Sequence, residues 1–201
     1  MIRLFILILI IAQSLFFIDL QGQKSVDSIP KYIIRQCVEV FDQQAREVNK
    51  NAKLGPLQFI EHKREYEYAY TSSSPDTGVA TLTIPKSVLV GDIDNDGTGE
   101  LIITATGNFG GIGSDGYEFV FEIKDGKWEL LTYLDEFDVF LEHMQVIDGQ
   151  LVGTTISWDK DDAHCCPTLV EEKRYKYDKQ KNQLIEVGRR ILRKVVIKDG
   201  E

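Results

Sequence analysis

An acidic segment, residues 92–100, has the residue types and spacing of a chelating loop. It reads Asp-Ile-Asp-Asn-Asp-Gly-Thr-Gly-Glu, with the glycine Gly97 where the backbone must fold back. Calcium takes six to eight oxygen ligands, and such loops supply side chains at alternate positions, a backbone carbonyl near the seventh and a further acid. We therefore expect a structural calcium site formed by Asp92, Asp94, Asp96, Thr98 and Glu100.

Two other interpretations of this segment compete with a calcium site. A helix-loop-helix calcium hand requires a glutamate at position twelve, where this chain has Ile103 within a strand-like run. Alternatively, the aspartates only build a tight turn by accepting bonds from nearby backbone N–H groups. Four carboxylates this close repel one another unless a cation or several donors neutralise them, which favours a bound cation.

The second segment with chemical potential contains adjacent cysteines, Cys165 and Cys166, after His164. Cys37 is the third thiol, so one disulfide can form in an oxidising compartment. We expect a bridge from Cys37 to Cys165 or Cys166, with the strained bond between the adjacent pair as the alternative. Zinc or copper binding by His164, the cysteines and nearby aspartates, or thiol exchange, is disfavoured because the chain lacks a Cys-x-x-Cys pair.

Other candidate sites give weaker signals. The glycine-rich run 107–116 lacks the Gly-Lys-Ser/Thr of a phosphate loop and is expected to be a hairpin tip or a flexible loop. No Gly-x-Ser-x-Gly nucleophile turn exists, and the three histidines are scattered. The tyrosine-rich residues 61–70 are expected to be an exposed edge strand or helix, with a carbohydrate-stacking surface as the alternative. An enzyme is therefore not indicated, although a cell-envelope hydrolase remains an alternative.

The amino-terminal residues have the pattern of an export signal. Arg3 precedes an apolar run, residues 4–11, and small residues follow. We expect residues 1–23 to be a signal peptide, although cleavage after Ser14 also fits, and residues 24–201 to form one secreted or periplasmic domain. Contact with a membrane is expected only if the amino-terminal segment stays uncleaved.

The charge of the chain limits its partners. It has 23 basic and 32 acidic residues and a net charge of -9, which disfavours nucleic acid. The basic residues concentrate in the apolar segment 189–198, which is expected to be a terminal strand or helix. The expected partner is an unidentified protein or glycan of the cell envelope.

The hydrophobic periodicity predicts an α+β fold, in which one helix packs on a mostly antiparallel β-meander. Apolar residues recur every three or four positions over residues 29–48, with Ser28 placed as a cap. Later runs are strand-like, and Asp125-Gly126 and Asp148-Gly149 predict two-residue hairpin turns. Phe119, Phe121 and Ile123 are expected on a buried face, opposite Glu118 and Glu122. The predicted strands span residues 79–84, 88–90, 101–106, 117–123, 127–133, 145–147, 150–156, 169–177 and 183–187.

Two resemblances follow from these motifs. The stretch from Gly91 to Ile103 resembles the calcium loops of FG-GAP and related β-repeat families, but it occurs once, so a propeller is not implied. Together with the late His-Cys-Cys-Pro-Thr element, it resembles a family of small, functionally uncharacterised secreted or lipoprotein domains of bacteria, over Val88 to Tyr177. This resemblance implies a fold and an exported location but no activity. The chain lacks the lipid-bearing cysteine of the lipoprotein members.

Overall fold

The computed structural model describes residues 24–25, 29–50, 54–72, 80–109, 114–137, 140–162 and 166–194. The expected signal peptide lies outside these residues, as do the predicted helix cap Ser28 and the loop residues His164 and Cys165.

Helix α2, Lys31–Val48, begins at a proline. The ring of Pro30 fixes φ near its helical value, and the Pro30 carbonyl accepts the N–H groups of Ile33 and Ile34. Among the described residues, no side chain caps this end. The apolar face predicted from the sequence is buried; its buried members are Ile33, Ile34, Cys37, Phe41 and Ala45.

The strands form two antiparallel sheets, which confirms the mostly antiparallel α+β class. The first sheet contains β1 (Lys24–Ser25), β2 (Leu54–Glu61), β3 (Glu65–Ser72), β4 (Ala80–Pro85), β5 (Ser87–Gly91), β6 (Glu100–Phe109), β7 (Asp115–Lys124) and β8 (Lys127–Phe137). The second contains β9 (Glu142–Ile147), β10 (Gln150–Ser157), β11 (Leu169–Asp178) and β12 (Gln183–Lys194).

The arrangement differs from the single predicted meander. The second sheet is a meander, with order β12-β11-β10-β9, but in the first sheet both β4 and β5 pair with β6. Strand β3 occupies most of residues 61–70, for which the sequence did not decide between an edge strand and a helix, and it lies between β2 and β4 and not at the edge. Its hairpin partner β2 was not predicted. Both Asp-Gly pairs form the predicted turns, with φ of 50° and 76° at Asp125-Gly126 and of 50° and 70° at Asp148-Gly149.

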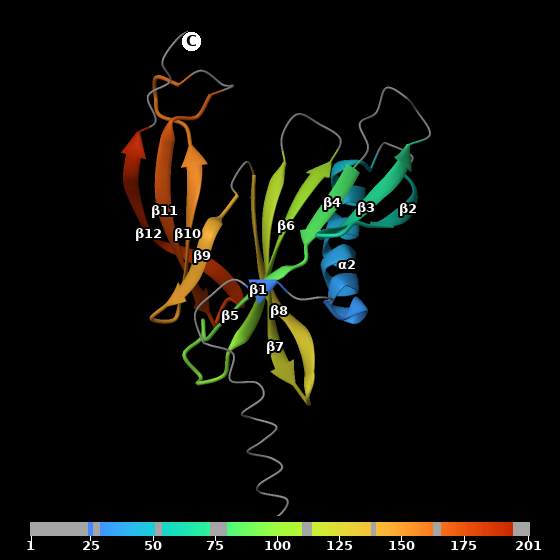
Figure 1. The fold of residues 1–201 in the computed structure, drawn as a ribbon, viewed down its shortest axis with the longest axis horizontal. Coiled ribbons are helices and arrows are strands. Elements are labelled where there is room, and N and C mark those ends of the chain that lie inside the picture. Colours follow the sequence, from blue (N-terminus) through green and yellow to red (C-terminus); the bar gives the residue numbers. More distant parts are fainter. Residues whose placement is uncertain are drawn as a thin grey trace, which may run out of the picture.

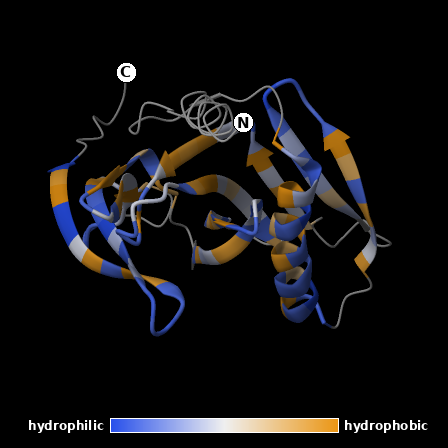
Figure 2. Cartoon of the chain, turned by 90° about the horizontal axis from the view of Figure 1, so that it is seen from below, coloured by the Kyte–Doolittle hydropathy of each residue, from blue (hydrophilic) through white to orange (hydrophobic). Residues whose placement is uncertain are grey.

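The first sheet is covered on both faces. Figure 1 shows α2 and the β9–β12 sheet on opposite sides of β6–β8. Ile103 and Phe119 pack in the cluster that contains the α2 side chains, whereas Ile102 and Val120 pack with Leu151 and Tyr175 of the second sheet. Figure 2 shows apolar residues on the strands and on the helix side that faces them. Two hydrophobic layers therefore lie on either side of one sheet.

This double burial corrects the predicted pattern of β7. Glu118 was expected to face solvent, yet it is 1% exposed, because the second sheet covers its face. Ile123 was expected to be buried, yet it is 50% exposed, because it lies beside the hairpin turn at the end of the strand. Phe119 and Phe121 are buried as predicted.

Candidate functional site: the acidic loop between two sheets

The acidic loop connects β5 to β6 and gathers four carboxylates. One carboxylate oxygen from each of Asp92, Asp94, Asp96 and Glu100 lies within 4.8 Å of the others. The strands position the ends of the loop, since Gly91 is the last residue of β5, and Glu100 is the first of β6 and pairs with it. The structure therefore brings together the four acids that the sequence singled out.

Glu100 is the buried member of the group. It is 3% exposed, and its Oε2 accepts the N–H of Ile93 at 2.8 Å. Burial raises the pKa of Glu100 to about 7; the Ile93 hydrogen bond opposes this, and the charges of the three aspartates add to it. A nearby cation would favour the ionised form of this buried carboxylate and offset the repulsion by the aspartates.

The three aspartates also form the turn. Asp92 accepts the N–H groups of Asp96 and Gly97 at 3.1 and 3.0 Å, and Asp96 accepts that of Thr98 at 2.7 Å. Asp94 accepts the Asp96 N–H at 3.0 Å. The aspartates therefore do accept the backbone N–H groups of the turn. The turn-building interpretation does not address Glu100, and the expected use of the Thr98 carbonyl as a ligand stays a prediction.

Two turns of the second sheet reach the loop. Lys179, in the β11–β12 turn, places its Nζ 2.7 Å from Asp94 Oδ2. This hydrogen bond raises the pKa of Lys179. Gly149, in the β9–β10 turn, lies so close that a Cβ there would fall 2.0 Å from the Asn95 amide nitrogen. The loop is therefore a junction between the two sheets, a property that the sequence did not reveal.

The donor set suits a hard cation. Carboxylate oxygens are the ligands that calcium and magnesium prefer. Four carboxylates face one lysine, so an ionised cluster keeps an excess of negative charge. Calcium would be held by the four acids, with a backbone carbonyl completing part of the shell. Calcium binding itself stays a prediction.

The expected Cys37 disulfide is wrong. Cys37 is a free cysteine with no exposed surface, and burial raises the pKa of its thiol far above the usual value. It belongs to the cluster between α2 and the first sheet, whereas Cys166 follows β10 of the second sheet. The first sheet separates the two positions. Cys166 is disulfide-bonded, and Cys165 lies outside the described residues.

The aspartates before the cysteines have structural partners. Asp162 accepts the N–H and the hydroxyl of Thr168, each at 2.8 Å, and the N–H of Asp159 at 2.7 Å. Desolvation raises the pKa of Asp162, but these hydrogen bonds outweigh it and the pKa is lowered. Asp159 pairs with Lys194 at 2.6 Å. These contacts close the loop, and metal binding at His164 stays untested because that residue is not described.

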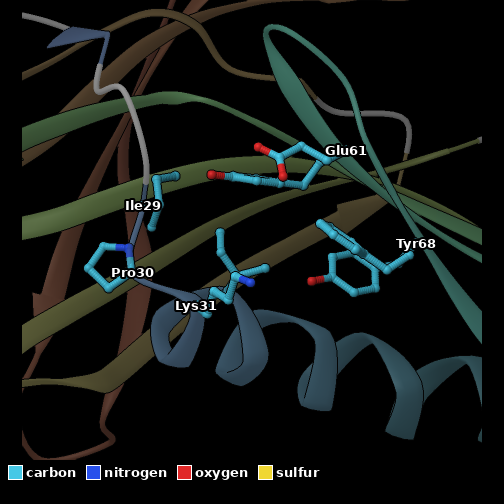
Figure 3. Close-up of a pocket in the computed structure, with 8 residues that line it drawn as sticks. Ile29, Pro30, Lys31, Glu61 and Tyr68 are labelled. Carbon is cyan, nitrogen blue, oxygen red and sulfur yellow. The ribbon is translucent and has the colours of Figure 1, made fainter.

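A cavity of about 330 Å³ lies away from the acidic loop, where α2 begins beside the β2–β3 hairpin. Figure 3 shows Glu61 and Tyr68 of the hairpin facing Ile29, Pro30 and Lys31. Sequence analysis missed this cavity because its two walls are separated along the chain. The spacing of Tyr66 and Tyr68, two positions apart and therefore on the same face of a strand, was the available signal.

No protein-family model and no curated protein matches the chain. The resemblance to secreted or lipoprotein domains therefore stays a prediction. Among the described residues, no helix combines the length and the apolar character needed to cross a membrane.

Proposed function

We propose that the chain is an exported, non-enzymatic binding or structural module whose acidic loop holds calcium. The observation that supports it is the burial of Glu100 beside three aspartates at a junction of two sheets. A buried acid with a pKa near 7 carries an energetic cost at neutral pH that a bound dication would remove. The role of the ion would be to stabilise the fold.

Calcium would act by tying the two sheets together. Bound to Asp92, Asp94, Asp96, the Thr98 carbonyl and Glu100, it would fix a loop that contacts both the β9–β10 and β11–β12 turns. The ion would weaken the ion pair between Lys179 and Asp94, because it supplies more positive charge at the same oxygens. The partner of the module is a protein or glycan of the cell envelope.

An exported location agrees with this chemistry. Extracellular modules bind calcium with dissociation constants of about 10⁻⁴ to 10⁻³ M, which suits a structural ion outside the cell. The export signal at residues 1–23 and a secreted or periplasmic location belong to the same proposal. So does a disulfide between Cys165 and Cys166, since Cys166 is disulfide-bonded and Cys37 is free.

The experiment is a thermal melt of the chain in chelator and in about 10 mM calcium. With a dissociation constant of about 1 mM, the ion would add about 1.4 kcal/mol of stability. For a domain of this size the melting temperature would rise by about 3–6 °C. The variant Asp94→Asn with Asp96→Asn should abolish this rise, because it removes two charges from the ligand set.

The matched control is Asp125→Asn with Asp161→Asn. These exposed turn residues change the net charge by the same amount, and asparagine tolerates the positive φ of position 125. This control should keep the full calcium response. Coincident melting curves of the unsubstituted chain with calcium and with chelator would contradict the calcium proposal. If calcium raised the melting temperature of both double variants equally, the ion would bind at a site other than the acidic loop.

The hydrolase alternative has less support. A glycosidase-type site needs two carboxylates on either side of the scissile bond. The cavity beside α2 contains one, Glu61, whose pKa is lowered by its hydrogen bond with Lys86. Glu61 is therefore held ionised by a lysine and is poorly placed to act as an acid.

A further inference from the structure

The cavity beside the start of α2 has an aromatic wall. Phe59 lies with its ring centroid 5.1 Å from that of Tyr68 and 6.1 Å from that of Tyr66. Ile29 and Ile34 form the opposite, aliphatic side. Its volume of about 330 Å³ is at the small end of the range of ligand pockets. A single ring with a short substituent fits such a space better than an extended chain.

One hydroxyl in this wall has no protein partner. Tyr66 is 6% exposed as a whole and lines the cavity, and within the described part of the chain its hydroxyl makes no hydrogen bond. The hydroxyl oxygen itself is not closed off from solvent. It is therefore able to donate a hydrogen bond to a molecule in the cavity.

The charge that remains uncompensated at the cavity is positive. Glu61 is neutralised by Lys86, whose Nζ lies 2.6 Å from Glu61 Oε1 and 4.6 Å from the Tyr66 ring centroid. Lys31 forms no ion pair with any described residue. It stands in the first turn of α2, which contains no acid, and no side chain of the described residues caps the N–H groups there.

We propose that this cavity binds a small aromatic carboxylate. The ring of the ligand lies against Phe59 and Tyr68, and its carboxylate lies at the start of α2, beside Lys31. The Tyr66 hydroxyl donates a hydrogen bond to the carboxylate. An anion is selected over a cation because Glu61, the only acid among the described residues that line the cavity, is already paired. This site is separate from the acidic loop and does not depend on calcium.

The experiment uses two probes of equal shape, phenylacetate and its neutral analogue phenylacetamide. Each is titrated into the full ¹⁵N-labelled chain in calcium-containing buffer, and amide chemical shifts are recorded. Phenylacetate should shift the amides of Lys31, Tyr66 and Tyr68 with a dissociation constant in the millimolar range or below. Phenylacetamide should bind at least fivefold more weakly, because it lacks the charge that Lys31 and the helix attract.

Three variants separate this site from adventitious binding. Lys31→Gln and Tyr66→Phe should each weaken phenylacetate binding about three- to tenfold. Lys160→Gln, which removes one exposed charge from the turn after β10, should leave binding unchanged. Thermal melts of these three variants check that the fold is intact. A fourth variant, Lys31→Arg, keeps the charge and should retain binding.

Several results would overturn the proposal. These are equal affinity for the acid and the amide, shifts that cluster outside the cavity, and the absence of any shift at about 20 mM probe. Preferential binding of methyl glucoside over phenylacetate would assign the aromatic wall to a sugar instead. None of these outcomes bears on the calcium proposal, whose readout is the response to the ion.

Discussion

The substitution Glu100→Gln offers a direct test of the electrostatics of the acidic loop. Glutamine keeps the shape of the side chain but cannot ionise. Burial raises the pKa of Glu100 from 4.5 to about 7, so the folded chain holds this proton more tightly than the unfolded chain. Stability contributed by the protonated acid is therefore complete at pH values below about 4.5 and is lost as the pH rises to about 8.

The size of the loss follows from the same pKa. At about 1.4 kcal/mol per pKa unit, the displacement corresponds to at most about 3.5 kcal/mol. Glu100 is 3% exposed, but residues 95–98 beside it are exposed, so water screens the aspartate charges. We therefore expect about 1–2 kcal/mol to be measured.

The assay is urea unfolding at several pH values from 4.5 to 8, with chelator present so that no ion is bound. The quantity of interest is the free energy of unfolding of the unsubstituted chain minus that of Glu100→Gln, in which the titrations of other groups cancel. This difference should fall by about 1–2 kcal/mol as the pH rises. A difference that stays constant or increases with pH would refute the burial and repulsion inferred for Glu100.

Further substitutions test the other junction contacts and the core. Lys179→Gln should strengthen calcium binding about two- to fivefold by calorimetry, because the ion no longer competes with an ammonium at Asp94; unchanged affinity would place the ion away from Asp94. Gly91→Ala should lower the free energy of unfolding by about 1–3 kcal/mol, since its Cβ would lie 2.4 Å from that of Val146, and combining it with Val146→Ala should restore part of the loss. If the two substitutions instead add independently, the sheets do not meet there. Cys37 should react with a thiol reagent only after denaturation, and Cys37→Ser should destabilise the chain by about 1–3 kcal/mol; rapid labelling of the native chain would show that this thiol is accessible.

Local patterns were sufficient for most of the secondary structure. The helix over residues 29–48 was predicted within two residues of its observed start, because its apolar positions repeat with the helical period. The Asp-Gly turns were predicted because few residues adopt their positive φ angles. Strand β3 was ambiguous, because a tyrosine-rich segment of alternating character can form either an edge strand or a helix face, and its partner β2 was not predicted.

The prediction of burial from the alternation of residues within a single strand was wrong where the strand is covered on both faces. Alternation in β7 predicted one buried face, but a second sheet lies over the other, so Glu118 is buried as well as Phe119. The pairing of Cys37 failed for a related reason. Its helix packs on one face of the first sheet, whereas the Cys166 loop follows a strand of the second sheet, on the other side. The sequence around each cysteine does not indicate on which face of the first sheet it lies.

The amino-acid sequence by itself determined the helix, the hairpin turns and the grouping of acids at residues 92–100, because each depends on residues within a few positions of one another. Only the tertiary structure decided that Glu100 is buried, that Lys179 and Gly149 meet the loop, and that an aromatic cavity forms beside α2. These features require the packing of elements far apart in the chain. Burial and charge proximity, which set the chemistry of a side chain, arise from that packing and not from spacing along the sequence.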